Sequence, residues 1–431
     1  MIYQRLLSRL RRSKTNGCRP KHWNRVIPKE HISSSALRVL SGLQDAGFIA
    51  YLVGGGVRDL LVGKIPKDFD VATDASPEQV RRIFRNSRII GRRFLIVHVF
   101  YHQEIIEVST FRAQINQPVM AADPHLEAAN NVFGTIEEDA WRRDFTVNSL
   151  YYNPDKRTVV DYTGGIDDLE KKLIRIIGDP AQRFHEDPVR LLRAIRLSAK
   201  LQFQIHADTE DQLRQLPNLL QHVAKSRLFD EMLKLFFTGH AQSTYLRLSE
   251  YNYLAALFPQ TVAALSSPSA PGTIPGTIPS TINMHLFIEL AMQETDRRYQ
   301  EQSSLNPGFL LAVLLWPAVQ KFIQESPKKK FHSALRHAIE KVLQRQVEVV
   351  IIPYRLASMM RAIWILQYYL TKPRGSRVYR TLFHRYFRAA FDFLTLRVQA
   401  GEQEQALLTW WAAFREADAP ERKRLLKEQP E

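Results

Sequence analysis

The chain has 431 residues, which exceeds the usual size of a single hydrophobic core, so two or more domains are expected. Sixty lysines and arginines against 44 acidic residues give a formal net charge of +16, which predicts salt-sensitive binding to polyanions. Nucleic acid fits this charge, and so does a membrane surface or a ribosome. The single cysteine, Cys18, excludes an intramolecular disulfide framework and a zinc site built from cysteines. The longest apolar run, 307–318, is too short for a membrane span and contains two prolines, so we expect no integral membrane association.

The first 32 residues form a basic segment. Nine lysines and arginines occur in residues 1–29, and the first acidic residue is Glu30. The segment lacks an apolar core long enough for a secretory signal. Its composition fits either an Arg-rich mitochondrial transit peptide or an arm that grips RNA. We favour a basic arm over residues 1–32, because nothing else in the sequence points to an organelle, and we expect the protein in the cytoplasm.

A glycine run follows the first predicted helix and strand. A serine can cap a helix over residues 33–46, which Gly47 ends. Residues 48–53 have the pattern of a strand, and the glycines at 54–56 separate this strand from a helix over 57–61. Glycines at such a place let backbone N–H groups approach an anion at the helix N-terminus. The pattern predicts a phosphate-binding turn.

Two aspartates, Asp68 and Asp70, follow shortly after this turn. In a strand they would point to the same side, roughly 6.6 Å apart, with Phe69 in the core. Such carboxylates suit Mg²⁺, which takes its remaining ligands from water and substrate phosphates, as in a two-metal displacement. The alternative is a pair of solvated turn residues after 63–67. The combination of glycine run and acid pair within one βαβ-sized unit favours the metal site.

A further acid lies inside a predicted strand. Residues 88–101 and 104–111 alternate as strands do and are joined by a short turn, which predicts a hairpin. Glu107 lies within the second strand, and a carboxylate inside an apolar strand needs a partner or an ion. An ion pair with an arginine such as Arg93 or Arg112 and a metal-facing role are both consistent with the sequence.

The segment after the hairpin is predicted to be a mobile loop over 114–131, followed by a helix. The helix carries a group of polar residues: Arg142, Arg143, Asp144 and Asn148. At a spacing of four residues, the aspartate and the asparagine would share one face of this helix. A structural salt bridge from Asp144 to Arg143 or Arg58 is the alternative to a role in chemistry.

From residue 166 onward the pattern is mainly helical, after a last predicted hairpin or edge strand over 151–161. A helical run over 189–203 begins beside Asp187 and carries arginines at a spacing of three: Arg190, Arg193 and Arg196. A solvated basic face is the simplest explanation of these arginines. A proline-, glycine- and serine-rich stretch over 265–282 predicts an exposed linker.

The last part of the chain, 283–431, interleaves aromatic and basic residues, as in Phe383-His384-Arg385-Tyr386-Phe387-Arg388. Aromatic residues at helical spacing commonly belong to a core. When they alternate with arginines they can also stack on bases and follow phosphates, so this region is a candidate for RNA contact. A short basic tail at 422–424 ends the region.

Taken in order, these motifs resemble nucleotidyltransferases of the DNA polymerase β type, in the bacterial branch that contains poly(A) polymerase and the tRNA CCA-adding enzymes. The matching stretches are 54–59, 68–73, 107–112, 142–150 and 186–193. The resemblance implies an α+β fold. A nucleotidyltransferase head of mixed sheet and helices would occupy 33–165, a helical neck and body would occupy 166–264, and a helical RNA-binding region would occupy 283–431.

The resemblance also implies roles for individual residues. Asp68 and Asp70 would hold two Mg²⁺, and Glu107 or Asp144 would be the third essential acid. Asp187 and Arg190 would pair with the Watson–Crick edge of the incoming base, which replaces a template strand. The full set of implied nucleotide contacts is Gly54, Gly55, Arg58, Arg142, Arg143, Asn148, Asp187, Arg190 and Arg193, with Asn148 toward the sugar and the arginines of 142–143 toward the triphosphate.

Two features favour poly(A) polymerase within this branch. The stretch 89–99 resembles the signature of that subfamily, and the chain contains no His-Asp dipeptide of the kind that marks the phosphohydrolase domain of some CCA-adding enzymes. The expected reaction is transfer of AMP from ATP to RNA 3′ ends, with RNA-degradation or RNA-chaperone proteins as candidate partners. CCA addition to tRNA and a non-catalytic RNA-binding function are the alternatives.

Overall fold

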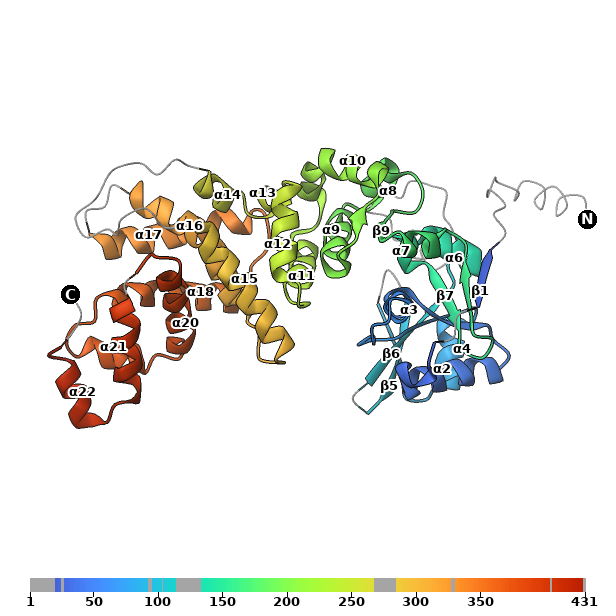
Figure 1. The fold of residues 1–431 in the computed structure, drawn as a ribbon, viewed down its shortest axis with the longest axis horizontal. Helices are drawn as coiled ribbons and strands as arrows, with labels where there is room; N and C mark the ends of the chain where they lie inside the picture. The colour runs from blue at the N-terminus through green and yellow to red at the C-terminus, as the bar shows by residue number, and fades with distance from the viewer. Residues whose placement is uncertain are drawn as a thin grey trace, which may run out of the picture. The chain divides into compact units, whose positions relative to one another are not determined.

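The computed structural model describes residues 20–24, 27–91, 95–102, 104–113, 133–266, 284–326, 330–403 and 405–428. The chain divides into two compact units. The first, which we call the sheet unit, comprises residues 1–187 and 203–212. The second, the helical unit, comprises residues 188–202 and 213–431, and Figure 1 shows that helices dominate it.

In the described part of the sheet unit, eight strands form one sheet in the order β1-β8-β7-β2-β3-β6-β5-β4. Neighbouring strands are antiparallel, except that β3 and β6 are parallel. The strands are β1 (Lys21–Asn24), β2 (Ala50–Val53), β3 (Asp70–Thr73), β4 (Ser87–Ile90), β5 (Ile96–Tyr101), β6 (Glu104–Thr110), β7 (Leu150–Asn153) and β8 (Thr158–Asp161). A short parallel pair, β9 (Leu173–Ile174) and β10 (Gln204–Ile205), completes this unit.

The helices of the sheet unit cover the apolar side chains of the sheet. They are α2 (Ser34–Asp45), α3 (Gly54–Leu61), α4 (Pro77–Ile83), α6 (Ile136–Arg142), α7 (Gly165–Glu170) and α8 (Pro180–Glu186), with 3-10 turns η1 (Lys29–His31) and η2 (Thr146–Asn148). Ser33 caps α2 by accepting a hydrogen bond from the backbone N–H of Ala36, as the sequence predicts. Helices α2 and α4 both contact β6, and α4 also contacts β4 and β5.

The helical unit is built from amphipathic and fully buried helices. They are α9 (Val189–Leu201), η3 (Pro217–His222), α11 (Lys225–Phe236), α12 (Ala241–Glu250), α13 (Tyr253–Leu257), α14 (Pro259–Leu265), α15 (Met284–Gln300), α16 (Pro307–Gln324), α17 (Phe331–Val347), α18 (Tyr354–Thr371), α19 (Arg377–Leu382), α20 (Phe387–Gln399), α21 (Gln405–Glu416) and α22 (Ala419–Leu425). Helix α10 (Ala207–Gln215) runs across the division between the units. Tryptophans 316, 364 and 411 are fully buried in the core of the helical unit.

Helix α16 is longer than the apolar run 307–318 suggested, because residues 319–324 continue it. By length and composition it could cross a membrane, the one helix in the described ranges that meets this test. Two thirds of it (67%) is buried inside the protein, and a core helix meets the same test.

Most predicted elements are confirmed, but several differ. The single strand expected over 88–101 is divided into two strands, β4 and β5. The helix expected to carry Asp144 and Asn148 ends at Arg142, because Arg143 adopts an extended backbone with ψ of 170°. Asp68 precedes strand β3 rather than lying in it. Lys21–Asn24, inside the range expected to be a basic arm, pair with β8 as an edge strand. The predicted loop 114–131 and residues 267–282 of the predicted linker lie outside the described residues.

The aromatic and basic C-terminal segment is largely structural. Val378, Phe387 and Trp411 belong to one buried cluster, and Tyr379 and Tyr386 pack against it. The side chain of Phe383, in contrast, is 72% exposed. RNA contact by this region stays a prediction, for which the exposed rings of Phe383 and Tyr354 (84% exposed) are the candidates.

Candidate active site

The glycine run forms the first turn of α3 directly after β2. The sequence placed the helix start at residue 57, whereas α3 already begins at Gly54, whose φ of +73° lies in the left-handed region that favours glycine. A Cβ atom at Gly54 would lie 3.5 Å from Asp70 Oδ2 and 3.6 Å from Arg143 Nη1. A Cβ atom at Gly56 would lie 3.2 Å from the backbone carbonyl oxygen of Asp68. The glycines thus bring the N-terminus of a helix, where backbone N–H groups have no helical acceptor, next to the acid pair.

The acids gather where β3 meets β6. Asp70 is the first residue of β3 and lies opposite Glu107 in the parallel pairing of the two strands. The pKa of Asp70 is raised to about 6, first by burial and then by the negative charge of Glu107, with a smaller contribution from Asp68, while the positive charge of Arg143 lowers it. Phe69 is 4% exposed, so it turns into the core between the two aspartates as predicted.

This environment fits a divalent cation. A carboxyl group whose pKa is raised by burial and by two neighbouring acids gains stability when a cation is bound beside it. Across the ranges that the structure describes, no group of three or more histidine, cysteine or acidic side chains is arranged to hold a metal ion. The side chains would therefore supply part of a coordination shell, which is the usual condition of Mg²⁺ at a phosphate-binding site.

Glu107 does not form the ion pair with Arg112 that the sequence offered as an alternative. Its Oε1 lies 3.4 Å from His98 Nε2, and its side chain is half exposed. Arg112 instead donates to the backbone carbonyl of Leu95. The second proposed arginine, Arg93, lies outside the described residues. Glu107 on β6 therefore lies between Asp70 on β3 and His98 on β5, and its neighbour on the side away from Asp70 is a histidine instead of an arginine.

Arg143 is held by a buried polar cluster, which we call the arginine clamp: Arg143, Asp139 and Tyr151. Arg143 Nε and Nη2 donate to Asp139 Oδ2 at 3.2 and 3.1 Å, and Nε also donates to the Tyr151 hydroxyl at 2.9 Å. The Tyr151 hydroxyl donates to the same Asp139 oxygen at 2.7 Å. Burial raises the pKa of Tyr151, which keeps this phenol neutral and able to donate. The clamp leaves Nη1 of Arg143 directed toward Gly54.

A further arginine, Arg183, binds the backbone where α6 ends. Arg183 of α8 donates through Nη2 to the backbone carbonyls of both Arg142 and Arg143, at 2.8 and 2.5 Å. Arg142 donates to the carbonyl of Ala113 at 3.3 Å. Side chains thus satisfy carbonyls that another turn of helix would otherwise use. Sequence reasoning missed Asp139, Tyr151 and Arg183; the spacing of four between Asp139 and Arg143 was the available signal for the first.

A second buried network lies behind the first turn of α3. Arg58, 3% exposed, donates to Asp59 Oδ1 from Nε and Nη2 and to Asn148 Oδ1 from Nη1 at 2.5 Å. Asn148 Nδ2 lies 3.5 Å from Asp144 Oδ1, which also accepts from the backbone N–H of Phe145 at 2.8 Å. Asp144 and Asn148 therefore meet as predicted, although through an irregular turn rather than along one helix. Arg58, which is itself buried, links α3 to Asn148.

The residues expected to read the base lie at the division between the units. Asp187 follows α8 at the end of the sheet unit, and Pro188 precedes α9. Arg190 and Arg193 lie on α9 in the helical unit, three residues apart and partly buried. Their predicted roles toward the base stay predictions.

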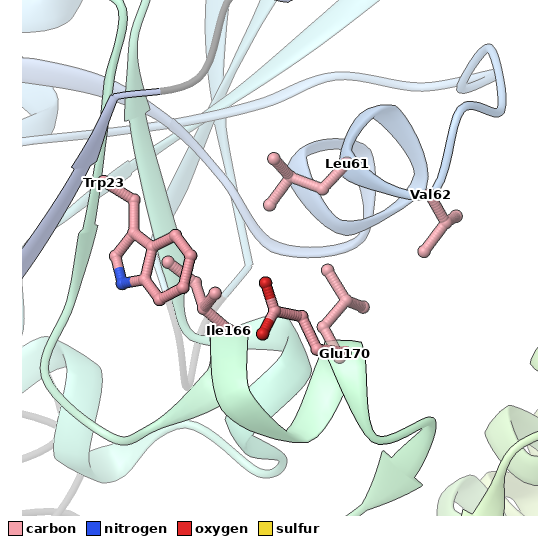
Figure 2. A pocket seen from close by; sticks show the side chains of 6 residues that line it. Trp23, Leu61, Val62, Ile166 and Glu170 are labelled. Atoms are coloured by element: carbon pink, nitrogen blue, oxygen red, sulfur yellow. The ribbon is translucent and has the colours of Figure 1, made fainter.

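A separate pocket lies at the opposite end of α3, away from the glycines. Figure 2 shows the Glu170 carboxylate directed between the indole of Trp23 on β1 and the end of α3. Its walls are mainly apolar: Trp23, Leu61, Val62, Ile166, Leu169 and Glu170. The pocket shares no lining residue with the acids or the clamp.

Comparison with known proteins identifies the family of this chain. Three family models match: the poly A polymerase head domain at residues 50–175, the probable RNA and SrmB-binding site of polymerase A at 202–265, and the polymerase A arginine-rich C-terminus at 327–431. Poly(A) polymerase I of Salmonella typhimurium is 42% identical over 94% of this chain and 87% of its own length. The chain belongs to the poly(A) polymerase family. The family predicted from the motifs is thereby confirmed.

The CCA-adding branch is more distant from this member of the poly(A) polymerase family. The CCA-adding enzyme of Lactobacillus helveticus is 37% identical, but over 49% of this chain and 51% of its own length. A solved structure described as a tRNA-processing enzyme in apo form I matches with a TM-score of 0.60 and 20% identity, covering 94% of this chain and 98% of that one. At that identity the likeness concerns the fold, and it confirms the predicted α+β class with a sheet-containing head and a helical remainder.

Proposed function

We propose that this chain transfers AMP from ATP to RNA 3′ ends without a template. The observation that carries the proposal is the 42% identity to Poly(A) polymerase I proteins over 94% of the chain. The meeting of a helix N-terminus, two aspartates, a glutamate and a clamped arginine around Gly54 supplies the parts that nucleotidyl transfer needs.

The triphosphate would bind at the first turn of α3. Gly54 and Gly55 present backbone N–H groups at the helix N-terminus, and a side chain at Gly54 would fill the space between Asp70 and Arg143. Arg143 would donate from Nη1 to a phosphate oxygen, because Asp139 and Tyr151 already engage its other nitrogens. Arg142 lies at the end of α6 beside it, and Asn148, braced by Arg58, would face the sugar.

Asp68, Asp70 and Glu107 would hold Mg²⁺ at the junction of β3 and β6. When bound, two such ions lower the pKa of the RNA 3′-hydroxyl and neutralise the leaving pyrophosphate. The carboxylates position the attacking oxygen and the α-phosphate, and no covalent intermediate on the protein is needed. Asp144, 9% exposed and bonded to the backbone of Phe145, would act as a support for Asn148 rather than as a third metal ligand.

Adenine selection would use Asp187 and Arg190, with Arg193 on the next turn. A carboxylate can accept from the exocyclic amine of adenine, and a guanidinium can donate to its ring nitrogens. RNA would be held by the positive charge of the chain and by exposed side chains of the helical unit such as Phe383. We place the protein in the cytoplasm, with RNA-degradation or RNA-chaperone proteins as partners.

Extension of a generic RNA 3′ end with each nucleoside triphosphate alone tests the reaction. ATP should give long homopolymeric products, and CTP should give little extension. A protein that adds only C, C and A to a tRNA lacking its end would be a CCA-adding enzyme instead, the alternative that the partial match to such enzymes offers.

Single substitutions of the acid pair test the site. Asp68→Ala and Asp70→Ala should each abolish extension while RNA binding stays close to wild type, because each removes a metal ligand. Asp45→Ala, at an exposed aspartate on α2, is the matched control and should keep full activity. Retention of more than a few per cent of activity by either site variant would contradict the metal assignment.

A further inference from the structure

The sheet carries a row of polar side chains that runs sideways from the acids. In the register of the strands, Asp70 on β3 lies opposite Glu107 on β6, Glu107 lies opposite His98 on β5, and His98 lies opposite Arg88 on β4. Residues opposite one another in neighbouring strands point to the same side of the sheet. The four side chains therefore follow one line across strands that are each roughly 4.8 Å apart.

The same side of these strands also carries exposed apolar side chains. Phe100 and Ile105 lie opposite each other next to the polar row, and their side chains are 40% and 46% exposed. Ile90 of β4 is 39% exposed on the other side of the row. The alternate residues of β5 and β6, such as Val97 and Val108, are buried; α4 contacts both strands and α2 contacts β6. We call this set the open face: the exposed Arg88, Ile90, Phe100 and Ile105, together with His98, whose side chain is 22% exposed.

The open face and the first turn of α3, where the triphosphate would bind, lie on different sides of Asp70. Strand β3 has β2 on one side and β6 on the other. Gly54 follows β2 directly, so the proposed triphosphate contacts lie on the β2 side of Asp70, together with Arg143. The open face begins on the β6 side. In-line displacement places the attacking hydroxyl and the leaving pyrophosphate on opposite sides of the reacting phosphorus.

We propose that the open face binds the last nucleotides of the RNA 3′ end and delivers the 3′-hydroxyl to the acids. The inference rests on the proposed function and adds a substrate surface to it. Strand β5 is two strands from Asp70, which is roughly 10 Å and matches one or two stacked nucleotides beyond the terminal sugar. Phe100 supplies a ring and Ile90 and Ile105 supply apolar surface for bases, while Arg88 faces the phosphates.

Steady-state kinetics of the full chain with an oligoadenylate primer tests this surface. The double variant Phe100→Ala with Ile105→Ala should raise the KM for RNA about 5- to 100-fold, the range expected from the loss of stacking on one base. The KM for ATP and the kcat at saturating RNA should stay within about twofold. The control is Ile49→Ala with Ile65→Ala, which removes two exposed apolar side chains (52% and 70% exposed) that lie outside these strands, and it should leave all three values unchanged.

A second measurement uses the unaltered protein and does not depend on the stability of a variant. An RNA that carries 4-thiouridine as its last nucleotide should crosslink, under ultraviolet light, to the peptide that contains residues 96–110. An unchanged KM for RNA in the double variant would overturn the inference, as would a rise in the KM for ATP alone or a change in oligomeric state with unaltered RNA kinetics. Failure of the proposed function has a different signature, because the wild-type chain would then not extend RNA with ATP at all.

Discussion

Asp139→Asn tests whether the arginine clamp sets the position of Arg143. The substitution keeps the shape of the side chain and removes the charge that faces Arg143 Nε and Nη2 at 3.2 and 3.1 Å. Breaking a buried ion pair costs about 3–5 kcal/mol. The Arg143 side chain keeps 21% exposure, so solvent screening should reduce the cost to below that range, about 2–3 kcal/mol. The loss should appear as faster hydrogen–deuterium exchange in the peptides of α6 and β7 of the full chain.

The same substitution should weaken the use of ATP more than the use of RNA. A misplaced guanidinium loses a charge-assisted hydrogen bond worth about 1.5–3 kcal/mol, so kcat/KM for ATP should fall about 10- to 100-fold. The KM for RNA should stay within about twofold. Tyr151→Phe is the graded control: it removes the 2.7 and 2.9 Å bonds of one hydroxyl, keeps the charges, and should cost about 1 kcal/mol. Wild-type exchange rates and an unaltered KM for ATP in Asp139→Asn would refute the reasoning.

Three further predictions concern charge. Without divalent metal, the folded chain has an Asp70 pKa of about 6 against an ordinary value of 3.8, so it binds a proton that the unfolded chain releases, and stability should fall as pH rises from about 4 to 6. Asp70→Asn should therefore raise the melting temperature at pH 7 in EDTA but not at pH 4; equal melting curves at pH 7 would contradict this. Glu402→Gln should lower the free energy of unfolding of the helical unit by about 3–5 kcal/mol, measured by urea unfolding. The reason is that Glu402 (2% exposed) is the acid paired with buried Arg397. A loss below about 1 kcal/mol would count against a contribution of this ion pair to stability. Deleting residues 2–19, which ends before β1, should flatten the dependence of RNA affinity on salt and leave the KM for ATP unchanged; an unaltered slope would mean that this segment does not touch RNA.

Local patterns in the sequence determined the parts of the site that lie close together along the chain. The glycine run, the acid pair two residues apart and the hairpin of β5 and β6 all depend on short-range rules: side-chain alternation, helix capping and the conformational freedom of glycine. These rules were sufficient to predict a phosphate-binding turn beside carboxylates. The roles predicted for Asp187 and Arg190 came from the resemblance to known nucleotidyltransferases and not from these rules.

Only the tertiary structure decided how these parts meet. The parallel pairing of β3 with β6 brings Glu107 opposite Asp70, and the pairing of β1 with β8 takes Lys21–Asn24 out of the predicted arm. Helix α6 stops at Arg142, and the residue that follows it, Arg143, hydrogen-bonds to Asp139, Tyr151 and Arg183. Strand pairing and buried ion pairs join residues that are far apart in sequence, and a local pattern carries no information on which of several distant partners will satisfy a given backbone or charged group.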